Sequence, residues 1–167
     1  MSLALMRIFF EEPNSKIDNR DACVHCGHKE VRITCVFDDL PQELVLDATA
    51  PTSLAAEGLL NADGDLQVVK VIDCGLAKPK TQVFAVANHP MNPAQGSLLL
   101  MKNSDLKNLA DELGVPRDVS RSSNVDLRRG IREAGKFAPV HTEVPLDKEV
   151  PTTGWIGWCR QSVPTAL

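Results

Sequence analysis

Two cysteines and a histidine near the start of the chain form its densest group of residues with metal-binding chemistry. Cys23 and Cys26 are separated by two residues, and Gly27 and His28 follow directly. Zinc binds thiolates and imidazoles in a tetrahedron, and structural sites usually take their ligands from close pairs. Glycine permits the sharp backbone bend that such a turn needs. The spacing therefore predicts a structural Zn²⁺ clip that includes Cys23 and Cys26.

The other ligands of this clip must come from elsewhere, because the chain has no second Cys-x-x-Cys pair. His28 and Cys35 are close in sequence, so we expect the zinc set to be Cys23, Cys26, His28 and Cys35. Other candidate ligands are His25, Cys74, His89, His141 and Cys159. Two more interpretations of the cysteine pair stay open, namely ordinary reduced thiols and a redox dithiol. The redox interpretation is disfavoured because a strand, not a helix, is expected to follow the pair.

The sequence contains no complete catalytic motif. His141-Thr142-Glu143 and the cysteine pair together match the ligand types of zinc-dependent nucleobase deaminases. In those enzymes the His-x-Glu unit precedes the cysteines, whereas here it follows them. Phosphate-binding glycine loops and a Gly-x-Ser-x-Gly elbow are also missing. We therefore predict no catalytic residue, with a zinc-dependent hydrolase or deaminase-like enzyme as the alternative function.

A second group with binding chemistry is basic and lies at residues 117–136. Six cations there stand against three carboxylates, although the formal charge of the whole chain is −4. The excess predicts contact with an anionic partner, either an acidic protein surface or nucleic acid. A solvated helix face is the remaining interpretation. The predicted contact residues are Arg117, Arg121, Arg128, Arg129 and Arg132.

The segment that carries these arginines resembles, in part, the helix-turn-helix and SAP-type modules that bind DNA. In such modules the second helix contacts the phosphates, and most of the arginines fall on the second predicted helix here. Its loop of about nine residues is longer than the three- to four-residue turn of a helix-turn-helix.

Trp155 and Trp158 are predicted to be an interface anchor, since tryptophan is enriched where proteins bind one another. Docking of these tryptophans on the chain's own core is the other interpretation.

The pattern of apolar residues predicts an α+β fold: a mainly antiparallel sheet of about six short strands, then a two-helix unit and an extended C-terminal tail. Alternating or continuous apolar runs bounded by turn residues predict strands. Apolar residues at helical spacing predict the helices. The expected strands are 3–10, 31–37, 44–46, 66–74 and 81–87, and 98–101 is expected to be a further strand or the entry to a helix. The expected helices are 104–113, capped by Asn103 or Ser104, and 124–135, capped by Asn124 and with Leu127, Ile131 and Ala134 on one face. A helical turn is expected at 51–58, ended by Gly58.

These elements suggest a β-rich core at 1–102, a basic helical pair at 103–136 and a tail at 137–167 that packs back on the core as part of one domain. Five cysteines without a disulfide framework indicate a reducing interior such as the cytoplasm. Neither a signal peptide nor a transmembrane segment is recognisable. We expect a non-enzymatic binding or structural protein, a component of a larger assembly, with no membrane partner.

Overall fold

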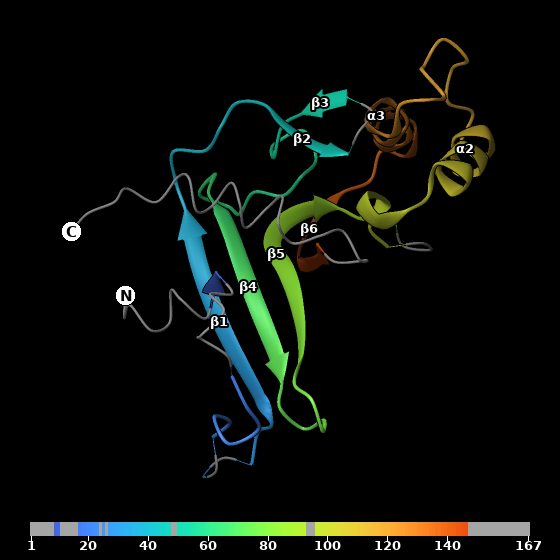
Figure 1. The fold of residues 1–167 in the computed structure, drawn as a ribbon. Helices are drawn as coiled ribbons and strands as arrows, with labels where there is room; N and C mark the ends of the chain where they lie inside the picture. The colour runs from blue at the N-terminus through green and yellow to red at the C-terminus, as the bar shows by residue number, and fades with distance from the viewer. Residues whose placement is uncertain are drawn as a thin grey trace. The chain divides into compact units, whose positions relative to one another are not determined.

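The computed structural model describes residues 9–10, 17–23, 25, 27–47, 50–92 and 96–146. It confirms the α+β class, with six strands and two α-helices among these residues (Figure 1). The strands are β1 (Glu30–Phe37), β2 (Leu44–Asp47), β3 (Ala50–Thr52), β4 (Leu66–Asp73), β5 (Lys80–Pro90) and β6 (Pro139–Pro145). The helices are the short 3₁₀ turn η1 (Leu98–Leu100), α2 (Asn103–Glu112) and α3 (Asn124–Gly135).

Four strands form one sheet in the order β1-β4-β5-β6, and β2 pairs with β3 in an antiparallel ribbon. Neighbouring strands β1 and β4 run in opposite directions (Figure 1). Four strands lie where the sequence predicts them: β1, β2, β4 and β5. Residues 98–101, predicted as a strand or the entry to a helix, contain the 3₁₀ turn η1, which directly precedes α2. Of the expected strand 3–10, only Phe9 and Phe10 lie within the described residues.

Two strands were not predicted, and both contain prolines. Strand β3 has Pro51 in its centre, and β6 begins at Pro139 and ends at Pro145. Proline cannot donate a ladder hydrogen bond, so it is typical of strand ends and sheet edges and weakens the sequence signal for a strand. Strand β6 occupies an edge of the four-stranded sheet, in agreement with this rule. Part of the segment expected as an extended tail is therefore a sheet strand.

The chain divides into two compact units, of which the first comprises residues 1–35, 68–84 and 146–167. Its described core contains Ile33 and Cys35 of β1 together with the nearly continuous buried run of β4. Lys70 is also buried there, and its Nζ donates a hydrogen bond of 3.1 Å to the carbonyl oxygen of Phe9. Buried charges need such partners, and this bond links Phe9 to β4 within unit 1.

The second unit comprises residues 36–67 and 85–145 and contains α2 and α3. The two helices pack against each other around seven buried apolar residues: Leu98, Leu106, Leu109, Ala110, Val115, Leu127 and Ile131. Helical spacing puts the members from each helix on one face, as the sequence predicts. Ala134, expected on the same face, is exposed. Gly130 permits close packing, because a Cβ there would lie 2.8 Å from Cγ1 of Val115.

Two asparagines predicted as helix caps have a different role. We expected Asn103 or Ser104 to cap α2 and Asn124 to cap α3, but both asparagines are the first residues of their helices. The Nδ2 of Asn103 donates a hydrogen bond of 2.7 Å to Oδ1 of Asn124, and this bond links the first residues of the two helices. Ser123 caps α3 instead, accepting a hydrogen bond from the Asp126 backbone N–H. An N-cap replaced by alanine typically costs about 1 kcal/mol.

Candidate functional site

A turn in unit 2 places a glutamate inside the protein. Residues 53–58 form a tight helical turn that starts at Ser53, whose Oγ accepts a hydrogen bond from the Ala56 N–H at 3.0 Å. The turn ends at Gly58, as predicted, and its φ of +64° is in the left-handed region that favours glycine. Leu54 and Leu59 are buried on either side. This geometry carries Glu57 into the interior, where only 1% of it is exposed.

Two arginines of α3 bind this buried carboxylate. Arg128, itself 2% exposed, donates from Nη2 to Oε1 at 2.8 Å and from Nε to Oε2 at 3.0 Å. Arg132 lies one helical turn further on, on the same face of α3, and its Nη1 donates to Oε2 at 3.1 Å. The Thr52 hydroxyl donates to Oε1 at 3.2 Å. Each carboxylate oxygen therefore accepts two hydrogen bonds.

This hydrogen bonding decides the ionisation state of Glu57. Burial alone raises the pKa of the carboxyl, because a low-dielectric interior disfavours the charged form. The hydrogen bonds and charge of Arg128, followed by those of Arg132, act in the opposite direction and outweigh burial. The net result is a pKa below the ordinary glutamate value. Glu57 is therefore a carboxylate at neutral pH, bound in a buried cluster with the two arginines.

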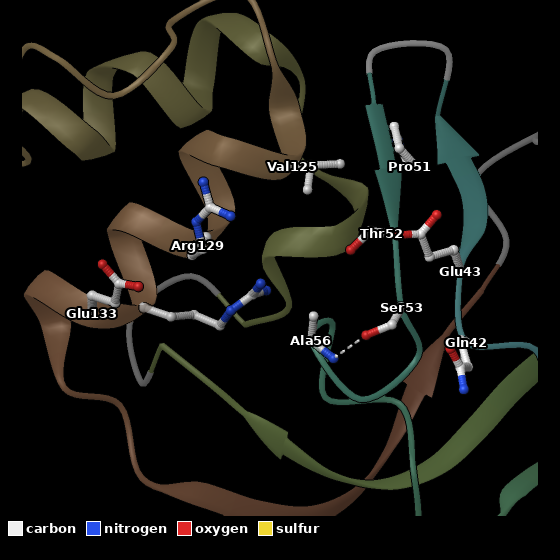
Figure 2. Close-up of a pocket in the computed structure, with 10 residues that line it drawn as sticks. Gln42, Glu43, Pro51, Thr52, Ser53, Ala56, Val125, Arg129 and Glu133 are labelled. Carbon is white, nitrogen blue, oxygen red and sulfur yellow. Dashed lines mark hydrogen bonds between the residues drawn. The ribbon is translucent and has the colours of Figure 1, made fainter.

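A pocket of about 500 Å³ lies beside this cluster, within unit 2. One wall belongs to α3 and contributes Val125, Arg129, Arg132 and Glu133. The opposite wall comes from β3, the turn after it and the residues that lead into β2: Gln42, Glu43, Pro51, Thr52, Ser53 and Ala56. Figure 2 shows the two walls facing each other, with Arg129 on the helix side and Pro51 and Thr52 on the strand side. The pocket therefore combines two arginines with carboxylate, amide and hydroxyl groups.

A buried histidine stabilises the same turn from β5. His89 was expected in a solvent-facing loop, but it lies within β5 and is 2% exposed. Its Nδ1 lies 3.0 Å from the Gly58 carbonyl oxygen and its Nε2 lies 3.1 Å from Ser97 Oγ. A carbonyl oxygen only accepts, so Nδ1 carries the proton and Nε2 accepts from the serine. Burial is the main reason that the pKa of His89 is lowered, so the ring is neutral.

The arginines that the sequence groups together occupy three environments. Arg128 lies in the interior, where its guanidinium is engaged by Glu57, and it does not belong to an exposed contact surface. Arg129 and Arg132 line the pocket, with side chains 63% and 13% exposed. Arg121 donates to the Val115 carbonyl and pairs with Asp111, while Arg117 is exposed on the loop between the helices. The spacing of the arginines in the sequence does not show which of them are buried, which line the pocket and which lie on the loop.

The predicted zinc ligands are not gathered in the part of the chain that the structure describes. Cys23 and His28 are exposed, whereas Cys35 is buried in β1, where burial raises the pKa of its thiol. Burial thus opposes the thiolate form that zinc requires. Cys26 lies outside the described residues, among which no group of three or more metal-binding side chains occurs. Gly27 has the expected positive φ, at +68°. The zinc clip stays a prediction.

Comparison with protein-family models, curated proteins and solved structures finds no match to this chain. The function must therefore be argued from the site alone. None of the described helices is long and apolar enough to cross a membrane. Trp155 and Trp158, the expected interface anchors, lie outside the described residues.

Sequence reasoning missed Glu57, although the chain contains a signal for it. The glutamate is the only charged residue in the segment from Pro51 to Leu60, which is otherwise largely apolar. A single acid flanked by residues that are expected to be buried requires a cationic partner. Two arginines four residues apart on one helix face, at 128 and 132, would supply such a partner. The sequence does not show that these segments meet, because they are separated by about seventy residues.

Proposed function

We propose that this chain is a non-enzymatic binding protein, a component of a larger assembly, and that it binds an acidic segment of a protein partner in the pocket of unit 2. The observation that carries the proposal is the pocket beside the buried ion cluster, with arginines of α3 on one wall and β3 on the other. Binding sites are typically concave and contain a few polar groups that orient the ligand. The hydrogen bond from Arg132 to the buried Glu57 holds this arginine on the α3 side of the pocket.

The charges around α3 favour a protein partner over nucleic acid. Residues 117–136 carry six cations and three carboxylates, but the fold brings Glu57 and Asp111 onto their arginines. The six cations then stand against five carboxylates, so the local excess of three charges falls to one. Nucleic acid is bound chiefly by many exposed cations that neutralise phosphates. An isolated acidic group on a peptide needs only one or two arginines.

Fluorescence anisotropy of labelled probes on the full chain tests the proposal. The probes are a decapeptide with one glutamate, the same peptide with glutamine in its place, and a DNA duplex. We expect the glutamate peptide to bind, with an affinity that falls as salt rises, because ion pairs are screened. Arg129→Glu should weaken this binding about five- to tenfold, since it places a repulsive charge in the pocket wall.

The matched control is Arg20→Glu, which makes the same charge change at an exposed position that does not line the pocket. It should change the affinity less than twofold. Equal weakening by the two reversals would mean that only overall charge matters, and the pocket would lose its role. Tighter binding of the duplex than of the glutamate peptide would favour the nucleic-acid interpretation instead. Failure of every probe to bind would refute the proposal.

A further inference from the structure

The ion cluster beside the pocket joins two arginines to one carboxylate among the described residues. Arg128 contacts both oxygens of Glu57. Arg132 contacts one oxygen through Nη1 alone, and Glu57 is its only carboxylate partner within 4 Å among the described residues. Arg132, whose side chain is 13% exposed, therefore shares this carboxylate with Arg128. An anion placed near Arg132 is stabilised more than it would be in water.

Arg132 is also the member of the cluster that lines the pocket, whereas Arg128 does not. A guanidinium has five N–H donors in a planar fork that matches the geometry of a carboxylate. One of these donors is held by Glu57, which restricts the orientation of the fork. No other hydrogen bond of the Arg132 side chain occurs within the described part of the chain. The remaining donors are available to a ligand in the pocket.

The other pocket residues limit how much negative charge a ligand carries. Glu43 and Glu133 are exposed carboxylates that line the same pocket, and they repel a second or third anionic group. Gln42 and Ser53 supply uncharged donors and acceptors of the kind that bind a peptide backbone. Arg129 is paired with Asp126 at 63% exposure, so it is less able than Arg132 to hold a carboxylate out of water. The pocket thus suits one negative charge on an otherwise uncharged ligand.

We infer that the pocket selects a single peptide carboxylate, which pairs with the edge of the Arg132 guanidinium that does not contact Glu57. The inference rests on the proposed binding function and specifies the ligand group. Both an acidic side chain and a C-terminal carboxylate have this chemistry. A volume of about 500 Å³ lies within the usual range for small-ligand pockets and accommodates a short segment.

Three labelled hexapeptides on the full chain test the inference. The first has one glutamate and an amidated C-terminus, the second has glutamine in its place, and the third has glutamine and a free C-terminal carboxylate. At least one carboxylate peptide should bind ten times more tightly than the neutral peptide, and the tighter of the two identifies the source of the carboxylate. Arg132→Lys should lower that affinity at least fivefold, because lysine keeps the charge but not the fork. Arg132→Gln should reduce it to the affinity of the neutral peptide.

Arg20→Gln, at an exposed position that does not line the pocket, serves as the control, and the circular dichroism spectrum of each variant verifies its fold. If Arg132→Gln does not fold, the unmodified chain still gives an answer, because millimolar acetate should displace the carboxylate peptide and equal chloride should not. Equal binding of all three peptides, or unchanged affinity in Arg132→Lys, overturns the inference. If the carboxylate peptides keep their affinity in Arg132→Lys while Arg129→Glu still weakens them, the proposed function stands without the pairing to Arg132. If no peptide binds, both fail.

Discussion

Replacing Glu57 with glutamine should strongly destabilise unit 2, because it removes the buried carboxylate that pairs with both Arg128 and Arg132. Charges about 4 Å apart interact by about 4 kcal/mol at an effective dielectric constant of 20. Removing one partner of a buried pair costs about 3–5 kcal/mol in measured cases. The 1% exposure of Glu57 leaves little solvent screening to reduce this figure. We therefore expect the free energy of unfolding, measured in urea by circular dichroism, to fall by about 4 kcal/mol.

A matched control separates burial from ion pairing. Arg32 and Glu30 form an ion pair at 3.2 Å, close to the 2.8 Å of Arg128 and Glu57, but their side chains are 45% and 48% exposed. Glu30→Gln should therefore cost at most about 1 kcal/mol. The double variant Glu57→Leu with Arg128→Met should be more stable than Glu57→Gln, since apolar replacement removes the buried charges together. A loss below about 1 kcal/mol in Glu57→Gln would refute the account of the cluster.

Three further predictions concern the turn and the cysteine pair. The pKa of His89 is lower in the folded protein than in the unfolded chain, so the unfolded chain binds a proton at a higher pH than the folded protein does. The free energy of unfolding should therefore fall as the pH drops below about 6.5, and His89→Gln should reduce this dependence on pH. Gly58→Ala should cost about 2 kcal/mol or more, because its φ is +64° and its Cβ would lie 2.5 Å from Pro90 Cδ. Gly64→Ala should cost about 1 kcal/mol, because it has a positive φ but open space around it; equal losses in urea unfolding would contradict the steric argument. Elemental analysis of the purified chain should find one zinc ion that is lost in Cys23→Ser, and a metal-free wild-type chain would remove the clip.

Local patterns predicted α2 and α3 because each helix has its apolar residues at a regular spacing within ten or twelve positions. The same spacing could not show that Arg128 is buried. That depends on Glu57, 71 residues earlier in the chain, and no periodicity reports a contact of this range. The sequence thus predicted the helix that carries the arginines, but their exposure to solvent depends on tertiary contacts.

The asparagines and prolines illustrate a related limit. Asn103 and Asn124 fit the helix-cap pattern, but each finds a better acceptor or donor in the other, across 21 residues. Pro51 and Pro139 weakened the strand signal at β3 and β6, although proline is tolerated in short or edge strands. In these cases the residue type was informative about local geometry. The partner that determined its role was distant in the chain.

The distance between Glu57 and Arg128 also matters during synthesis of the protein. Chains emerge from the ribosome N-terminal end first, so the turn with Glu57 is made well before α3. Until α3 is complete, this carboxylate has neither of its arginines and favours hydration over the interior. Nascent chains that stop before residue 128 should therefore keep this part of unit 2 open and sensitive to proteases. The ion cluster closes only when α3 has been added.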